Sequence, residues 1–250
     1  MKIGVLSAMA KEHAQLTGLL KDAVTEHEGN YEFTIGTLGK NTLILMSSGM
    51  GKVNAAVGAT ILIRRYAPDC VISTGCAGGI DERLQVMDVV VSSETAYHDV
   101  SIPGYEPGQM QGLPARFRAE QELVEAALKA HPQAPPVKEG SSCARETKVS
   151  KGIIVSGDQF ITERAQLDRI KALFPEALAV DMESAAIAQT CFLLQTPFVS
   201  FRILSDTPGA DKHLEQYFNF WDEMADRSFD VTRQFLTALP EQFSLLPFDE

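Results

Sequence analysis

The chain has 250 residues, 45% of them hydrophobic and 22% charged, a composition typical of one globular domain spanning 1–250. Lys and Arg number 22 against 33 for Asp and Glu, and the formal net charge of −11 argues against nucleic acid and anionic membranes as partners. No apolar stretch approaches the roughly 18 residues of a membrane span, so none is predicted.

The cysteines indicate a reducing compartment. Cys70, Cys76, Cys143 and Cys191 form no CxxC pair and no Cys/His spacing of the zinc type. We therefore expect free thiols in a cytoplasmic protein, with no metal site and no cofactor.

Hydrophobic periodicity alternates between strand and helix along the first part of the chain. Strands are predicted at 2–7, 31–36, 41–47 and 69–74, and helices at 9–20 and 53–66. The small residues at 75–79, which follow the last of these strands, fit a ligand cradle and a tight turn equally well.

The second part continues the alternation and adds two irregular segments. Strands are predicted at 86–93, 152–156, 178–180 and 198–204, and helices at 119–130, 162–173, 184–194 and 217–236. Residues 96–108 are rich in Gly and Pro and form a long loop of the kind that is usually functional, whereas 131–148 forms a surface excursion. The sum is an α/β fold with a mostly parallel central sheet and helices on both faces.

Carboxylates gather where two apolar strands end. Asp181 and Glu183 follow one strand and Asp206 ends the next, which also carries Arg202. The helix predicted at 184–194 lies between the two strands, so the three elements are predicted to form a strand–helix–strand crossover. Ligands collect at the carboxyl ends of the strands in such units, and capping of the helix accounts for only one of these acids, so we favour a functional site. Glu12, taken alone, is better explained as an acid that complements the dipole of its helix.

Several short motifs occur in a characteristic order through residues 1–206. They are GVLSAMAKE at 4–12, SGMGKV at 48–53, TGCAGG at 74–79, YHD at 97–99, SGDQFI at 156–161, VDME at 180–183 and LSD at 204–206. Together they resemble the purine nucleoside phosphorylase/uridine phosphorylase superfamily, and within it the methylthioadenosine/S-adenosylhomocysteine nucleosidases. The resemblance implies a single-domain three-layer α/β/α fold with a central mixed, partly barrel-like sheet.

The resemblance also implies an activity. A hydrolase of this kind cleaves the N-glycosidic bond of 5′-methylthioadenosine and S-adenosylhomocysteine, giving adenine and the free thio-ribose in methionine salvage. Its partners are a small nucleoside and a second copy of the chain, since a homodimer is expected in which the loop around Tyr105 reaches the neighbouring subunit's 5′ pocket.

Residue roles follow from the matching motif positions. Glu12 is expected to activate the attacking water, Glu183 to bind the ribose, and Asp206, oriented by Ser205, to protonate adenine. The other substrate-binding residues expected are Met9, Met50, Cys76, Ala77, Gly78, Phe160, Ile161, Asp181, Met182, Arg202 and Tyr105, with Phe160 stacking on the base. Tyr217 or Phe218 is expected in the 5′ pocket.

Other functions remain open at the level of sequence. Asp181 stands where the nucleosidases usually have Glu, and Cys76 where they usually have Ser. Alternatives are a futalosine hydrolase, a purine nucleoside phosphorylase, or a non-catalytic nucleoside-binding protein. The segment 7–12 contains no arginine for phosphate, which favours water as the nucleophile.

Overall fold

The computed structural model describes the chain except for residues 131–146, 209, 211–212, 222–224 and 243–250. Its strands are β1 Lys2–Ser7, β2 Lys21–Glu28, β3 Tyr31–Leu38, β4 Asn41–Ser47, β5 Cys70–Gly79, β6 Val89–Tyr97, β7 Phe117–Arg118, β8 Val149–Ser156, β9 Ala177–Asp181 and β10 Phe198–Asp206. Its helices are α1 Ala10–Thr17, α2 Lys52–Tyr66, α3 Gln121–Ala130, α4 Arg164–Leu173, α5 Ser184–Leu193, α6 His213–Asn219 and α7 Ala225–Ala238.

The central sheet is mixed and part of it closes into a barrel. Strands β10, β6, β8, β9 and β5 follow one another in hydrogen-bonded order, and β10 also pairs with β5, which closes a ring of strands. Beyond β5 the sheet continues as an open wing through β1, β4, β3 and β2. One buried cluster takes side chains from every strand of the ring, including Ala77, Val90, Ile154, Ala179 and Leu204. The expected partly barrel-like sheet is confirmed.

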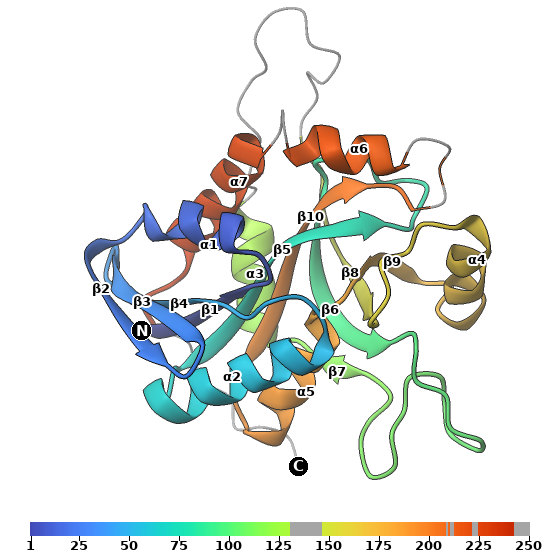
Figure 1. Cartoon of the computed structure of the whole chain (residues 1–250), viewed down its shortest axis with the longest axis horizontal. Coiled ribbons are helices and arrows are strands. Elements are labelled where there is room, and N and C mark those ends of the chain that lie inside the picture. The colour runs from blue at the N-terminus through green and yellow to red at the C-terminus, as the bar shows by residue number, and fades with distance from the viewer. Residues whose placement is uncertain (131–146, 209, 211–212, 222–224, 243–250) are drawn as a thin grey trace, which may run out of the picture.

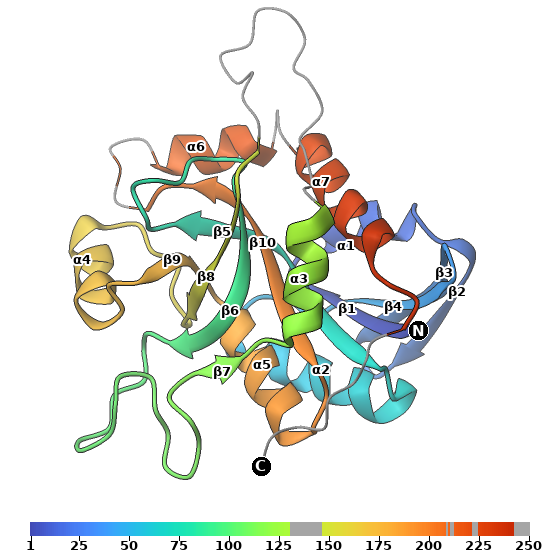
Figure 2. The same ribbon diagram turned by 180° about the vertical axis from the view of Figure 1, so that it is seen from behind.

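Helices cover both faces of the sheet, as expected for a three-layer fold. Helices α2 and α5 lie together on the face turned toward the viewer in Figure 1, and α3 and α7 cover the opposite face in Figure 2. Phe201 of β10 stacks on Phe235 of α7 with ring centroids 4.4 Å apart. All nine residues of β10 are buried, because a strand covered on both faces has no polar side to present to water.

The region that was predicted to form a strand–helix–strand crossover differs from a simple parallel unit. Strands β9 and β10, which flank α5, are not neighbours: β5 lies between them, parallel to β10 and antiparallel to β9. The prediction of a mostly parallel sheet is wrong at this point. Ring closure provides the reason, because it turns β9 against the end of β5.

Three further expectations about the elements need correction. The strand predicted at 69–74 was expected to end before 75–79, but β5 continues through Gly79 because its backbone pairs with β10 and β9. The predicted helix over 217–236 is two helices, α6 and α7, with residues 222–224 between them outside the described part. Strand β2 was not predicted, since most of its residues are exposed and polar. The excursion expected at 131–148 lies mostly outside the described residues.

Within the described part of the chain, no helix has the length and apolar character required to cross a bilayer.

Candidate active site

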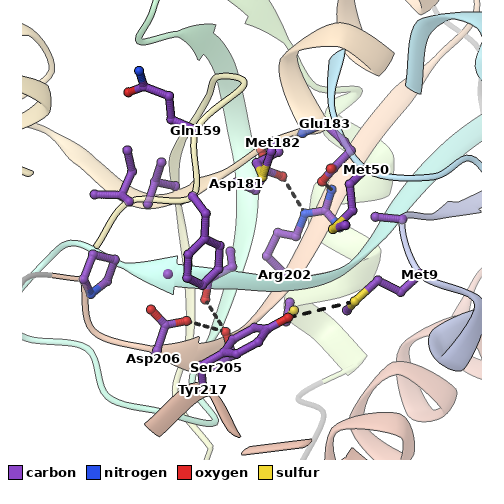
Figure 3. Close-up of a pocket in the computed structure, with 18 of the residues that line it drawn as sticks. Met9, Met50, Gln159, Asp181, Met182, Glu183, Arg202, Ser205, Asp206 and Tyr217 are labelled. Atoms are coloured by element: carbon purple, nitrogen blue, oxygen red, sulfur yellow. Dashed lines mark hydrogen bonds and ion pairs between the residues drawn. The ribbon is translucent and has the colours of Figure 1, made fainter. Parts of the chain in front are cut away.

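A pocket opens where the ring of strands meets α1 and α6, a concave position of the kind that small-molecule sites occupy. Figure 3 shows the side chains that line it. Every predicted site residue except Tyr105 lines this pocket: Met9, Glu12, Met50, Cys76, Ala77, Gly78, Phe160, Ile161, Asp181, Met182, Glu183, Arg202, Ser205 and Asp206. Tyr105 lies outside it, on the loop between β6 and β7, with 39% of its surface exposed.

Strand register brings distant parts of the sequence into this one pocket. On β10, Asp206 lies opposite Gly78 of β5, and Arg202 lies opposite Gly75. Gly78 is also the partner of Val180, the residue before Asp181. The motifs at 74–79, 180–183 and 204–206 therefore meet because β5 pairs with both β9 and β10.

A buried ion pair forms the floor of the pocket. Arg202 is 1% exposed, and its Nε donates to Oδ2 of Asp181 at 2.7 Å. Asp181 also accepts hydrogen bonds from the hydroxyls of Ser156 and Ser184. A buried charge is tolerated when it is paired and hydrogen-bonded, so the Asp181 carboxylate is committed to holding Arg202.

Glu12 reaches this floor from the first turn of α1. Its carboxylate accepts the backbone N–H groups of Met9 and Cys76, each at 3.2 Å. Gly75 makes room for it: with φ at +146°, a Cβ there would lie 2.8 Å from the Glu12 carboxylate and 2.7 Å from the Arg202 guanidinium. Burial raises the pKa of Glu12, although the Arg202 charge and the backbone donors act in the opposite direction.

Glu183 lies on the other side of Arg202. Its Oε1 accepts the backbone N–H of Gly51 at 2.9 Å, and its Oε2 is 4.0 Å from a guanidinium nitrogen of Arg202. Burial, and then the neighbouring Asp181, raise the pKa of Glu183 to about 7 despite the Arg202 charge. The pocket thus holds a carboxyl group whose charge changes near neutral pH.

The raised pKa of Glu183 predicts a pH dependence of the unfolding free energy. Because the pKa of Glu183 is raised from 4.5 to about 7, the folded state is favoured while the group is protonated, and this contribution is lost as the pH rises from 4.5 through about 7. At about 1.4 kcal/mol per pH unit the loss amounts to roughly 3 kcal/mol. The non-titrating variant Glu183→Gln should therefore gain unfolding free energy relative to the parent protein by up to about 3 kcal/mol between pH 5 and pH 8.

Urea denaturation at the two pH values measures this difference, and Glu82→Gln, a change at a surface carboxylate whose side chain is 84% exposed, serves as the control. A difference between parent and Glu183→Gln that is the same at pH 5 and pH 8 would show that the pKa is not raised.

Asp206 and Ser205 occupy a different side of the pocket from Glu183 (Figure 3). Asp206 is 3% exposed, and its Oδ1 accepts the hydroxyl of Ser205 at 2.6 Å. This bond fixes the plane of the carboxyl group.

Apolar side chains form the walls between these polar groups. The rings of Phe160 and Tyr217 meet edge to face with centroids 5.2 Å apart, and the Tyr217 hydroxyl lies 4.0 Å from the sulfur of Met9. Phe160 and Met50 are 46% and 61% exposed, which leaves apolar surface at the pocket mouth. Aromatic faces beside a few convergent polar groups suit a planar heterocycle joined to a hydroxylated group.

The Cys76 thiol is unsuited to covalent catalysis. Burial, followed by the charge of Glu12, raises its pKa well above the ordinary value, so the thiol stays protonated.

Sequence reasoning missed several lining residues and left one choice open. Ala8, Gln159, Val180 and Pro208 also line the pocket, and of these Ala8, Gln159 and Val180 lie within the quoted motifs. Tyr217 lies in the pocket, whereas Phe218 is outside it and 61% exposed. Successive residues of a helix point in directions about 100° apart, and the sequence did not show which of the two side chains faces the pocket.

Comparison with known proteins agrees with this fold and identifies the family of the chain. The family model described as the phosphorylase superfamily matches residues 2–237, and the chain belongs to this family. Its similar relatives are 5′-methylthioadenosine/S-adenosylhomocysteine nucleosidases: that of Geobacillus sp. (strain WCH70) is 38% identical over 96% of this chain and 99% of the relative. That of Anoxybacillus flavithermus is 40% identical over 96% of this chain and 99% of the relative.

Solved structures give the same result. A nucleosidase of this type from Colwellia psychrerythraea 34H, in complex with adenine, superposes with a TM-score of 0.86 at 39% identity and covers 96% of each chain. One from Neisseria meningitidis, in complex with methylthio-immucillin-A, gives a TM-score of 0.84 at 38% identity over 95% of this chain and 99% of that chain.

Proposed function

We propose that the chain hydrolyses the N-glycosidic bond of 5′-methylthioadenosine and S-adenosylhomocysteine and releases adenine. The observation that carries this proposal is the arrangement of Glu12, Glu183 and Asp206 in one pocket with aromatic walls, around the buried Arg202. Relatives that cover nearly the whole chain and bear this activity in their names support the choice of substrates.

Each carboxyl group has a separate part in the reaction. As the bond from the sugar's anomeric carbon to the base breaks, the electron pair goes to the base, and Asp206 supplies the proton that neutralises it. Glu183 binds the ribose hydroxyls and stabilises the positive charge that develops on the sugar. Water then bonds to the anomeric carbon while Glu12 accepts its proton.

The surroundings of Glu12 favour water over phosphate. Among the described residues, Arg202 is the one arginine that lines the pocket, and its charge is engaged by Asp181. Lys11 donates to the Trp221 carbonyl outside the pocket, and Arg83 pairs with Asp81 on the surface. A phosphate dianion beside Glu12 would meet a like charge. Ordinary phosphate sites instead offer several free hydrogen-bond donors.

Product analysis tests the proposal. The protein is incubated with methylthioadenosine, S-adenosylhomocysteine or inosine, with and without phosphate. We expect adenine and the free thio-ribose from the first two substrates at a rate indifferent to phosphate. A sugar 1-phosphate with phosphate-dependent turnover would identify a phosphorylase, and tight nucleoside binding without any product would identify a binding protein.

The same proposal includes a homodimer in which the Tyr105 loop completes the partner's pocket. Apolar side chains are exposed both on this loop, at Ile102 and Tyr105, and near the pocket mouth, at Met50 and Val53. Exposed apolar surface of this kind marks an interaction site, and a second copy of the chain brings both patches into contact.

Tyr105→Ala tests this arrangement. Removing a buried aromatic contact from the 5′ pocket is expected to raise the KM for methylthioadenosine about tenfold. The affinity for free adenine, which has no 5′ group, should stay unchanged and serves as the internal control. Light scattering of the parent protein should give the mass of a dimer, and a monomer that keeps full activity on dilution would contradict the proposal.

We place the reaction in the cytoplasm and in methionine salvage. The cysteines among the described residues, Cys70, Cys76 and Cys191, are free thiols, as is typical of a reducing compartment.

A further inference from the structure

Three charged residues form a closed ring at the rim of the pocket. Lys52 donates its backbone N–H to Oδ1 of Asp158 at 2.8 Å, and its Nζ to Oδ2 of Asp99 at 2.7 Å. The same Asp99 oxygen accepts the backbone N–H of Asp158 at 2.9 Å. Lys52 and Asp158 are thus joined twice, directly and through Asp99; we call this set the Lys52 ring.

The Lys52 ring joins the two segments that form opposite parts of the pocket. Lys52 begins α2 immediately after Gly51, whose N–H holds the Glu183 carboxylate at 2.9 Å. Asp158 lies two residues before Phe160, on the segment that leads to Ile161. Successive backbone amides at the start of α2 therefore hold one carboxylate from the ribose side and one from the base side.

The segments that meet at the ring are in close contact. A Cβ on Gly157 would lie 2.5 Å from the His98 ring and 2.9 Å from Cγ of Asp99, so the chain before Asp158 lies directly against residues 98–99. Burial of Asp99 opposes its charge, but the hydrogen bonds from Lys52 and Asp158 hold its pKa below the ordinary value. Asp99 is therefore charged at neutral pH.

Stability alone gives a weak reason for this arrangement. The side chains of Lys52, Asp99 and Asp158 are 24%, 20% and 49% exposed, and ion pairs that water reaches contribute little to folding. None of the three lines the pocket, so none is placed to touch the substrate.

We propose that the Lys52 ring is a positioning device, which holds the base-binding segment at Phe160 in register with the Gly51 turn that orients Glu183. This inference rests on the proposed function for the roles of base and ribose. Bond cleavage requires both ends of the nucleoside to be held at once, and a misplacement of about 1 Å can cost about 100-fold in rate.

The test compares Asp158→Ala, which removes the direct link, with Lys52→Met. The second variant removes the link through Asp99 and the contact of Nζ with Oδ2 of Asp158 at 3.8 Å, but it keeps the stronger part of the direct link, the hydrogen bond from the backbone N–H. Because the links run in parallel, each single variant should lower kcat/KM for methylthioadenosine only about threefold, and the double variant should lose about tenfold more than the product of the two. Adenine affinity, measured by calorimetry, should show the same excess loss.

Two further variants serve as controls. Asp158→Asn keeps an oxygen that accepts the Lys52 N–H. Its kcat/KM and adenine affinity should therefore stay within about twofold of the parent protein, and the combination with Lys52→Met should stay within about twofold of Lys52→Met alone. Asp168→Ala removes a carboxylate of α4 that pairs with Arg164 at 2.9 Å, and it should also change the affinity less than about twofold. Thermal melting confirms that each variant is folded at the assay temperature.

Several results would overturn the inference. One is a loss of kcat/KM and of adenine affinity in the double variant that equals the product of the losses in the two single variants. Another is unchanged kcat/KM and adenine affinity in every variant. If the double variant does not fold, equal adenine affinities of Asp158→Ala and Asp158→Asn overturn it instead. A failure of the proposed function is distinct, since the parent protein would then release no adenine, whereas adenine binding still reports on the ring.

Discussion

Asp206→Asn is expected to lower kcat by about 10²–10⁴, the usual contribution of a general acid. Asparagine keeps the size of the side chain and an oxygen that accepts the Ser205 hydroxyl, which is 2.6 Å from Asp206 in the structure. It has no acidic proton to give to the leaving base, so the loss should fall on turnover and spare binding. Single-turnover assays with methylthioadenosine measure the first effect and calorimetry with adenine the second.

A matched control is Asp81→Asn, which changes a carboxylate paired with Arg83 outside the pocket. It should keep parental kcat. Turnover of Asp206→Asn at nearly the parental rate would remove Asp206 from the role of acid, and a loss seen only in KM would assign it to binding.

Glu12→Gln is expected to cost a similar factor of about 10²–10⁴ in kcat, because glutamine cannot accept the proton of the attacking water. In the parent protein Met9 and Cys76 donate to different oxygens of Glu12, so the single amide oxygen of glutamine keeps one of these two hydrogen bonds. The helical bonds of α1 do not depend on the other, so the fold of its first turn should survive. Near-parental hydrolysis by this variant would show that another group activates water.

The pH dependence of the parent enzyme follows from the same carboxyl groups. Burial raises the pKa of Glu12 above 4.5 and that of Glu183 to about 7. In the proposed reaction both groups act in their ionised form. Since protonation below these values removes the active form, kcat/KM should fall as the pH drops below about 7, well before the ordinary range of a glutamate. A profile that stays flat down to pH 4.5 would contradict the raised values.

Local sequence patterns were sufficient for most elements of the fold. Apolar runs predicted β1, β4 and β10, because a strand buried on both faces needs a continuous apolar sequence. The cluster of Asp181, Glu183 and Asp206 was also visible, since each acid follows an apolar strand directly. The short motifs, in their order, led to the family and to nearly all of the residues that line the pocket.

Only the tertiary structure determined the contacts and the charge states of those residues. The pairing of β5 with β10 kept 75–79 within a strand and set Gly75 against Arg202, a contact between residues far apart in sequence. The same closure directed Asp181 to the Arg202 guanidinium, although it had been assigned with the substrate contacts, and it placed Glu12 and Glu183 where burial raises their pKa values. Sequence patterns report which face of a strand or helix is apolar, whereas charge states and hydrogen-bond partners depend on non-local neighbours, which exist only once the ring of strands has closed.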